Sequence, residues 1–305
     1  MILVTGAAGA LGTLIAQRLG DRDDTILGTR DPGQLQAPLP VRRLDFDEPR
    51  TLVKGFEGVD VLLLISAGYG EDDTVIARHR AALDAAEKSG VRHVVYTSLT
   101  AAGDHLPYAL PHRWTERRIQ ESTMDWTILR NGLYAELLAR IAAPSADGRI
   151  TAPLGEGRLA AVARADLADA AVRVTVEASA HAGRVYELVG EQAVGGADLA
   201  RAHGPHVTYE PETLARTRAR IAAGGAEPFQ VPMLVGTCSA VAAGFLSPTG
   251  GDLRRLLGRA PRCPLAAALA QCRVRQCSPV ASAGTVGSRS HGGAAGRGFP
   301  EAALP

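Results

Sequence analysis

The feature that most constrains the fold is the glycine-rich stretch Gly6-Ala7-Ala8-Gly9-Ala10-Leu11-Gly12. It follows an apolar run at residues 2–5, which predicts a buried strand, and it opens a helical pattern at residues 10–19. Glycines at this spacing let the chain turn tightly and let backbone N–H groups approach a pyrophosphate at the N-terminus of the helix. The stretch therefore predicts a dinucleotide-binding loop, and the alternative is a glycine-rich turn that binds nothing.

Strands and helices alternate through the first half of the chain. Short apolar runs predict strands at residues 25–29, 41–44, 59–65, 91–97 and 126–129, and helical patterns occur at 74–89 and 111–122. The nearly continuous apolar run at 59–65 is typical of a strand that is covered on both faces. We therefore expect an α/β fold in which a Rossmann-like, doubly wound parallel sheet is built from βαβ units.

The pattern loosens after residue 131. A helix is predicted at 164–177, a strand at 184–189, and further short elements at 206–209, 212–223 and 251–258. We expect an NAD(P)-binding Rossmann domain at 1–150, to which residues 159–190 return, and a smaller α+β lobe on the substrate side at 191–270. Residues 271–305 are rich in Gly, Ser and Arg without periodicity, which predicts a disordered tail.

Composition excludes several classes of protein. The chain has 305 residues, of which 46% are hydrophobic, and its net charge is +1, without the basic excess of a general nucleic-acid or membrane-surface binder. The longest weakly polar stretch, residues 233–246, is shorter than the roughly 20 residues of a spanning helix. We expect no signal peptide, because a basic n-region is missing, and no metal site, because the four late cysteines lack zinc-ligand spacing. A cytoplasmic protein with free thiols is the default.

Two strand ends carry side chains that suit the adenosine half of a dinucleotide. Arg30 follows the second predicted strand, where an arginine binds the 2′-phosphate of NADPH and an acid would bind the ribose of NADH. NADPH is favoured, NADH stays open because Asp31 comes next, and Arg30 could instead be a solvated loop charge. After the third strand, Asp45 could accept the adenine amino proton while Phe46 offers an N–H. The competing interpretation is that Asp45 or Asp47 caps the following helix.

Two further strand ends point to the same crevice. Ser66 and Ala67 form a small-residue edge that lets the backbone approach a ribose, and Thr97 and Ser98 end the fifth strand. In an open α/β sheet, ligands lie beyond the carboxyl ends of the strands. We therefore expect the ends of the third, fourth and fifth strands to face one crevice.

A motif that standard short-chain dehydrogenases need is missing. They reduce ketones with Tyr-x-x-x-Lys, in which the lysine lowers the pKa of the tyrosine for proton transfer. Lys54 and Lys88 are the only lysines, and neither follows a tyrosine at that spacing; Tyr108 is followed four residues later by His112. A hydride acceptor that needs little acid help, such as a quinone, fits better.

Several segments together carry a family resemblance. They are GAAGALG at 6–12, TRDP at 29–32, ARHR at 77–80, VVYTS at 94–98, His112-x-x-x-Glu116, TILRNGLYAE at 127–136, RAD at 164–166, VYEL at 185–188, VTY at 207–209 and LLGR at 256–259. With these segments the chain resembles the type 2 NAD(P)H:quinone oxidoreductases, in the NmrA-like branch of the atypical short-chain dehydrogenases. The resemblance runs from residue 1 to about residue 271.

The resemblance implies an enzyme that reduces quinones with NADPH in a two-electron step, without flavin or metal. The pyrophosphate loop would consist of Gly6, Ala8, Gly9, Ala10, Leu11 and Gly12. Arg30 would bind the 2′-phosphate, and the Ser66-Ala67 and Thr97-Ser98 edges would line the ribose and the nicotinamide.

The resemblance also assigns three catalytic positions. His112 stands where related reductases carry a lysine near the nicotinamide ribose, so it would position the cofactor or donate a proton. Asn131 and Tyr134 would border the quinone pocket. Each has a structural alternative: a histidine on a helix surface, a turn residue and a core aromatic, respectively. Glu116 and Glu136 are expected to make structural ion pairs.

Other functions stay open at this point. The glycine motif fits equally an NADP(H)-sensing regulatory protein without turnover, as in other NmrA-like proteins. A weaker interpretation is a reductase of another small conjugated carbonyl or ether. A closed space around the nicotinamide would favour a sensor, and an open one would favour an enzyme. The expected partner is a small-molecule quinone, and a homodimer is left open.

Overall fold

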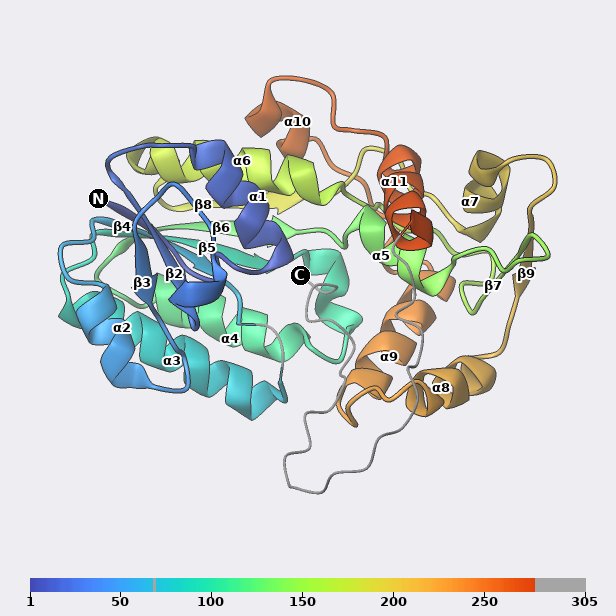
Figure 1. Cartoon of the computed structure of the whole chain (residues 1–305), viewed down its shortest axis with the longest axis horizontal. Helices are drawn as coiled ribbons and strands as arrows, with labels where there is room; N and C mark the ends of the chain where they lie inside the picture. Colours follow the sequence, from blue (N-terminus) through green and yellow to red (C-terminus); the bar gives the residue numbers. More distant parts are fainter. Residues whose placement is uncertain (68–69, 278–305) are drawn as a thin grey trace, which may run out of the picture.

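The computed structural model describes residues 1–67 and 70–277. In this part of the chain, strands and helices alternate as predicted and then give way to a helical lobe (Figure 1). The strands are β1 (Ile2–Val4), β2 (Thr25–Thr29), β3 (Val41–Arg43), β4 (Val61–Ile65), β5 (His93–Leu99), β6 (Asp125–Asn131), β7 (Arg149–Ala152), β8 (Arg184–Leu188) and β9 (Thr208–Pro211). The helices are α1 (Ala10–Leu19), α2 (Pro49–Gly55), α3 (Asp72–Lys88), α4 (Ala109–Gln120), α5 (Ala135–Ile141), α6 (Arg164–Val176), α7 (Gly196–His203), α8 (Leu214–Ala223), α9 (Gln230–Ala242), α10 (Asp252–Leu257) and α11 (Pro264–Cys277).

The main sheet has seven parallel strands in the order β3-β2-β1-β4-β5-β6-β8. The strand order reverses between β1 and β4, which is the switch point of a doubly wound sheet. At such a point the connecting helices leave toward opposite faces, so the carboxyl ends of β1 and β4 open a crevice. The predicted fold class, a Rossmann-like α/β sheet, is confirmed.

Two helical layers cover the sheet. In Figure 1, α1 and α6 lie above it and α2, α3 and α4 lie below it. The upper layer buries Ile15 and Leu167 against Leu63 of β4. The lower layer buries Leu83 and Ile119 among side chains of the opposite face of the strands. Because both faces are covered, β4 is continuously apolar, as the run at 59–65 indicated, and every residue of β5 is buried.

The lobe has its own hydrophobic core, which joins α5, α7, α9 and α11 with the short parallel pair β7 and β9. The apolar stretch around residues 228–245 forms α9, whose buried Met233 and Val241 belong to this core. Sequence patterning left α5, β7, α7, α9 and α11 unassigned. Helices α9 and α11 show no clean amphipathic period, and the other three elements are short. Helix α10 packs on α6 and β8, although the predicted division places residues 251–258 with the lobe.

The predicted first residue of the disordered C-terminal tail was wrong. The disordered tail was expected from residue 271, but α11 continues to Cys277. The helix persists because residues 264–277 are rich in Ala, Leu, Gln and Arg, which are good helix formers even without an apolar stripe. Residues 278–305 lie outside the described residues.

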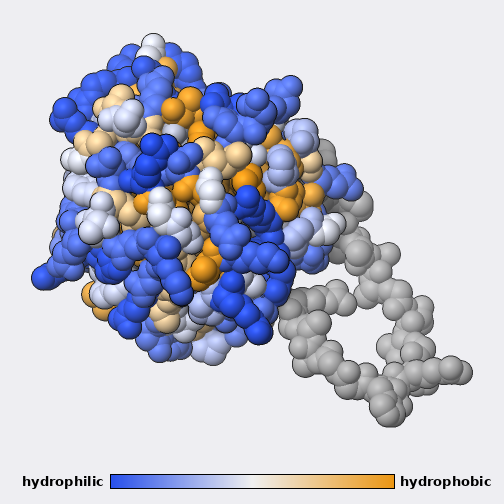
Figure 2. Space-filling view, turned by 90° about the vertical axis from the view of Figure 1, so that its left-hand side faces the viewer, coloured by the Kyte–Doolittle hydropathy of each residue, from blue (hydrophilic) through white to orange (hydrophobic). Residues whose placement is uncertain are grey.

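One face of the molecule is mainly polar (Figure 2). The face that turns to the left in Figure 1 carries mostly hydrophilic side chains with smaller hydrophobic areas between them (Figure 2). No helix among the described residues is long and apolar enough to cross a membrane.

Candidate functional site

A cavity of about 330 Å³ opens beyond the carboxyl ends of the strands around the switch point. Its walls come from the β1–α1 loop, the ends of β2, β3 and β4, and single residues of α3, β5 and the segment before α5. The lining residues are Thr5, Gly6, Ala8, Gly9, Ala10, Leu11, Gly12, Thr29, Arg30, Leu44, Asp45, Phe46, Asp47, Ile65, Ser66, Ala67, Arg78, Thr97 and Tyr134. The fold thus brings most of the predicted cofactor residues to one cavity.

The glycine loop is shaped by close backbone contacts. Gly6 has φ +60°, a conformation that residues with a side chain rarely adopt. A Cβ on Gly12 would lie 2.2 Å from the carbonyl oxygen of Gly6, so any larger residue would push α1 away from the loop. Gly9 precedes α1 without a side-chain cap. The first N–H groups of α1 therefore face the cavity without partners from the helix itself, which suits a pyrophosphate.

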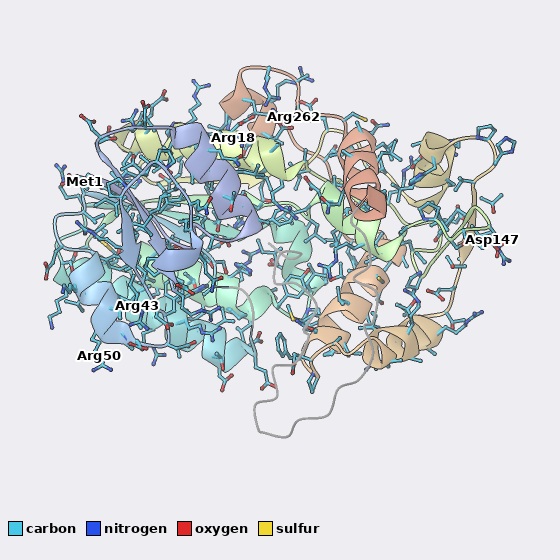
Figure 3. All side chains as sticks on the ribbon, viewed as in Figure 1. Met1, Arg18, Arg43, Arg50, Asp147 and Arg262 are labelled. Carbon is cyan, nitrogen blue, oxygen red and sulfur yellow. The ribbon has the colours of Figure 1, made fainter. Side chains whose placement is uncertain are left out.

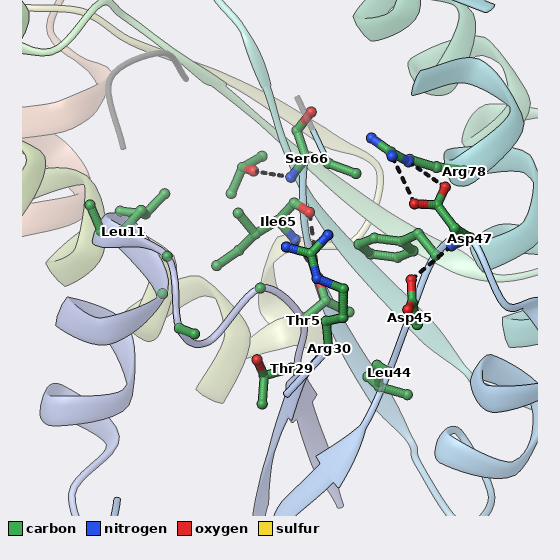
Figure 4. Close-up of a pocket in the computed structure, with 18 of the residues that line it drawn as sticks. Thr5, Leu11, Thr29, Arg30, Leu44, Asp45, Asp47, Ile65, Ser66 and Arg78 are labelled. Atoms are coloured by element: carbon green, nitrogen blue, oxygen red, sulfur yellow. Dashed lines mark hydrogen bonds and ion pairs between the residues drawn. The ribbon is translucent and has the colours of Figure 1, made fainter. Parts of the chain in front are cut away.

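Charged residues gather at the ends of β2 and β3. Arg78 of α3 donates from Nε and Nη2 to the two carboxylate oxygens of Asp47, at 2.7 and 2.8 Å. These hydrogen bonds hold the pKa of Asp47 below its usual value, and the charge of Arg30 lowers it further. Figure 4 shows Arg30 beside this pair and opposite Leu11.

The loop after β3 presents polar groups without capping the next helix. The Asp45 carboxylate accepts the N–H of Asp47 at 3.0 Å, while α2 begins after Glu48 without a side-chain cap. The N–H of Phe46 has no hydrogen-bond partner within the described part of the chain. The capping interpretation of Asp45 and Asp47 is therefore wrong, and the adenine-binding role stays a prediction.

A residue that the sequence did not single out holds the peptide bond between Ser66 and Ala67, which follow β4 and line the cavity. His79 of α3 is fully buried, and its Nε2 accepts the N–H of Ala67 at 2.9 Å. Its Nδ1 lies 2.7 Å from the Oγ1 of Thr115, whose own hydrogen goes to the carbonyl oxygen of Pro111. Nδ1 must therefore be the donor, so this network selects one neutral tautomer. Burial lowers the pKa of His79 to about 3, in agreement with a neutral ring.

The edge formed by residues 66 and 67 is held from β5 as well. The N–H of Ser66 donates to the Oγ1 of Thr97 at 3.0 Å, so Thr97 both lines the cavity and fixes its neighbour. His79 lies in the ARHR segment at 77–80, but a histidine inside an apparent surface helix gave no signal of its burial. Only the packing of α3 on the sheet brings it against Ala67.

Tyr134 reaches the cavity from the segment before α5. The guanidinium of Arg164 lies over its ring, 4.6 Å from the ring centroid. Burial raises the pKa of Tyr134 to about 12, so the phenol stays protonated at neutral pH. Its hydroxyl has no hydrogen-bond partner among the described residues. Asn131, at the end of β6, is buried with an unpaired Oδ1 but does not line the cavity.

Two other predicted residues lie away from the cavity. Side chains alternate along a strand, so Tyr96 and Ser98 of β5 face the α4 side while Thr97 faces the cavity. Ser98 donates to Glu116 at 2.6 Å, and Nδ1 of His112 lies 2.9 Å from the hydroxyl of Tyr96. Burial lowers the pKa of His112 to about 3. His112 is therefore a buried neutral residue, not one on a helix surface.

The ion pair expected for Glu116 is confirmed, with Arg113 and Arg130 at 2.8 and 2.7 Å. Glu136 behaves differently, because its carboxylate accepts the backbone N–H of Arg164 at the start of α6. In the part of the chain that the structure describes, no group of three or more His, Cys, Asp or Glu side chains could hold a metal ion.

Comparisons with known proteins agree with this geometry. A family model described as NAD(P)H-binding matches residues 6–178. Quinone oxidoreductase 2 of Escherichia coli (strain K12) is 33% identical over 272 residues, which cover 85% of this chain and 94% of that protein.

Two solved structures with a bound cofactor are also similar. The NADPH-dependent quinone oxidoreductase of Escherichia coli, in complex with NADPH, has a TM-score of 0.79 and 30% identity, covering 88% of this chain and 99% of that chain. The triphenylmethane reductase of Citrobacter sp., in complex with NADP(H), has a TM-score of 0.81 and 28% identity, covering 89% of this chain and 100% of that chain.

Proposed function

The chain belongs to the NAD(P)H-binding, NmrA-like family of Rossmann-fold oxidoreductases and is itself an NAD(P)H oxidoreductase, and we propose that it reduces quinones with NADPH by direct hydride transfer. The observation that carries the proposal is that the uncapped start of α1, Arg30 and Tyr134 line the same cavity. When bound there, the cofactor supplies a hydride. No flavin enters the proposed step.

The residues of the cavity fit a phosphorylated dinucleotide. The glycine loop leaves no room for a Cβ at Gly12, and it presents backbone N–H groups where a pyrophosphate would lie. Arg30 would bind the 2′-phosphate through charge-assisted hydrogen bonds. Phe46 and Asp45 would offer a donor and an acceptor to adenine, and the Ser66–Ala67 edge would hold the ribose.

Tyr134 supports a quinone as the acceptor. A quinone that receives a hydride becomes an oxyanion, which a nearby neutral donor stabilises before a proton arrives from water. The phenol of Tyr134 remains protonated at neutral pH and borders the cavity, and its hydroxyl makes no hydrogen bond to the described residues. Because the chain lacks a Tyr-x-x-x-Lys pair, reduction of simple ketones is not expected. His112 and Asn131 do not line the cavity, so they would affect the cofactor or the quinone only through the residues that they contact.

The proposal is tested by mixing the purified protein with NADPH and a panel of quinones, and following NADPH absorbance. We expect rapid oxidation of NADPH only when a quinone is present, and little oxidation with aliphatic ketones. Tight NADPH binding without oxidation by any quinone would contradict the proposal and support an NADP(H) sensor.

Arg30→Ala tests the cofactor assignment. We expect the Kd for NADPH to rise at least tenfold and the Kd for NADH to change less than twofold, because a charge-assisted contact to the 2′-phosphate is worth about 1.5–3 kcal/mol. Cofactor fluorescence measures both constants. Equal losses for the two cofactors would reject the phosphate-binding role. Arg117→Ala, on the exposed face of α4, is the matched control.

A further inference from the structure

A second arginine reaches the cavity, and the roles proposed above do not use it. Arg78 lines the wall beside Arg30 and extends from the middle of α3, a helix of 17 residues. Its side chain is only 21% exposed. It forms a two-pronged ion pair with Asp47, whose side chain is half exposed (Figure 4).

Asp47 is a difficulty for a site that binds phosphate. It lines the same cavity as Arg30, and Arg30 lowers its pKa, so the two charges interact. An ionised carboxylate here would repel a 2′-phosphate and compete with it for the Arg30 guanidinium. Like charges that face each other across a binding site weaken binding strongly.

The pair with Arg78 removes this difficulty. Both carboxylate oxygens of Asp47 receive a hydrogen bond from Arg78, so the guanidinium holds the carboxylate and balances its charge. The loop is also held by the hydrogen bond from the Asp47 N–H to Asp45. Arg78 acts from a packed helix, and its planar fork matches a carboxylate in a way that a lysine would not.

We propose that Arg78 is a specificity-determining residue for the 2′-phosphate and that it acts through Asp47. Its ion pair balances the charge of Asp47, so this carboxylate competes less with the phosphate for the Arg30 guanidinium. This inference rests on the proposed use of NADPH. It adds the residue that lets the site bind a 2′-phosphate although the Asp47 carboxylate lies nearby. Arg78 is thus a positioning residue, since the phosphate contact itself belongs to Arg30.

The test compares Kd values for NADPH and NADH on the full chain carrying R78A, D47N or both substitutions. We expect R78A to weaken NADPH about tenfold, equal to about 1.4 kcal/mol, while NADH changes less than twofold. D47N should bind NADPH at least as well as the unmodified chain. The double variant should recover NADPH affinity to within about threefold, because no carboxylate remains to be neutralised.

Two outcomes would overturn the proposal. If the double variant binds NADPH as weakly as R78A, Arg78 contacts the phosphate itself. If R78A weakens both cofactors equally, or neither, the pair has no role in specificity. R80A, two residues away on the same helix and outside the cavity, controls for losing an arginine from α3.

These outcomes can be separated from a failure of the proposed function. If the unmodified chain binds no NADPH, the proposed function fails. If it binds NADPH, and R30A but not R78A loses the preference, only the inference about Arg78 fails. Thermal unfolding of each variant shows whether it is folded.

Discussion

At the scale of single residues, His79 connects the packing of α3 to the edge of the cavity. Its Nε2 is an acceptor only because Thr115 holds the proton on Nδ1. The Ala67 N–H is thereby kept at a fixed position beside the expected ribose. This role depends on one tautomer of a ring that burial keeps neutral.

His79→Ala should therefore impair cofactor binding more than chemistry. Leaving the Ala67 N–H without its acceptor costs about 1–3 kcal/mol of stability, so we expect the backbone at residues 66 and 67 to shift. We expect the KM for NADPH to rise about tenfold while kcat falls less than threefold in quinone-dependent assays. His79→Gln offers an oxygen near the Nε2 position and should restore part of the loss. If kcat falls as steeply in both variants as KM rises, His79 does not act by positioning the edge.

At the scale of elements, one contact between α4 and the sheet joins two buried neutral side chains. His112 of α4 meets the hydroxyl of Tyr96 on β5, and burial raises the pKa of that phenol. The pKa of His112 falls from its usual 6.5 to about 3, so between these values the unfolded chain binds a proton that the folded chain does not. The part of the free energy of unfolding that depends on neutral His112 is therefore fully present above about pH 6.5. It decreases as the pH falls toward 3.

His112→Asn should flatten this pH dependence. Each such histidine lowers the free energy of unfolding by up to about 1.4 kcal/mol per pH unit below pH 6.5, and Asn keeps a polar atom near the Nδ1 position. Urea unfolding at pH 7.5, 6 and 5 measures the slope. We expect the variant to lose less stability between pH 7.5 and 5 than the unmodified chain. His206→Asn, an exposed control, should leave the slope unchanged; equal slopes for all three proteins would contradict the explanation.

At the scale of the whole molecule, one charged cluster ties the C-terminal segment to the sheet layer. Asp166 of α6 is fully buried. Its carboxylate accepts a hydrogen bond from the backbone N–H of Arg262 at 2.6 Å and forms an ion pair with the guanidinium of Arg259 at 2.7 Å. Asp169 pairs with Arg262 and with Arg18 of α1. Figure 3 shows Arg18 and Arg262 on the same side of the molecule. The cluster thus sets where α11 begins, and α11 packs on α5, which follows Tyr134.

Asp166→Asn should destabilise the protein by about 2 kcal/mol. Breaking a buried ion pair costs roughly 3–5 kcal/mol, and the partial exposure of both arginines reduces this value. The midpoint of urea unfolding measures the loss. Glu121→Gln removes an exposed pair with Arg117 and should leave the midpoint almost unchanged. Similar losses in the two variants would show that burial of Asp166 adds nothing.

Local patterns in the sequence determined much of this protein. Apolar runs with period 2 or 3.6 and a glycine turn act over a few residues, so they predicted the parallel sheet, its helices and the loop before α1. They also predicted the strand ends that line the cavity, including Arg30, whereas Tyr134 was expected only from the family resemblance. The roles of these residues toward NADPH and a quinone stay predictions.

Only the tertiary structure decided which side chains reach the site from elsewhere. The strand ending at Ser98 was expected, but the face on which Ser98 lies depends on the register of β5 against its neighbours. Arg78 and His79 meet Asp47 and Ala67 only because α3 packs on one face of the sheet. Contacts between residues far apart in the chain depend on how whole elements pack, and no local period or turn encodes that.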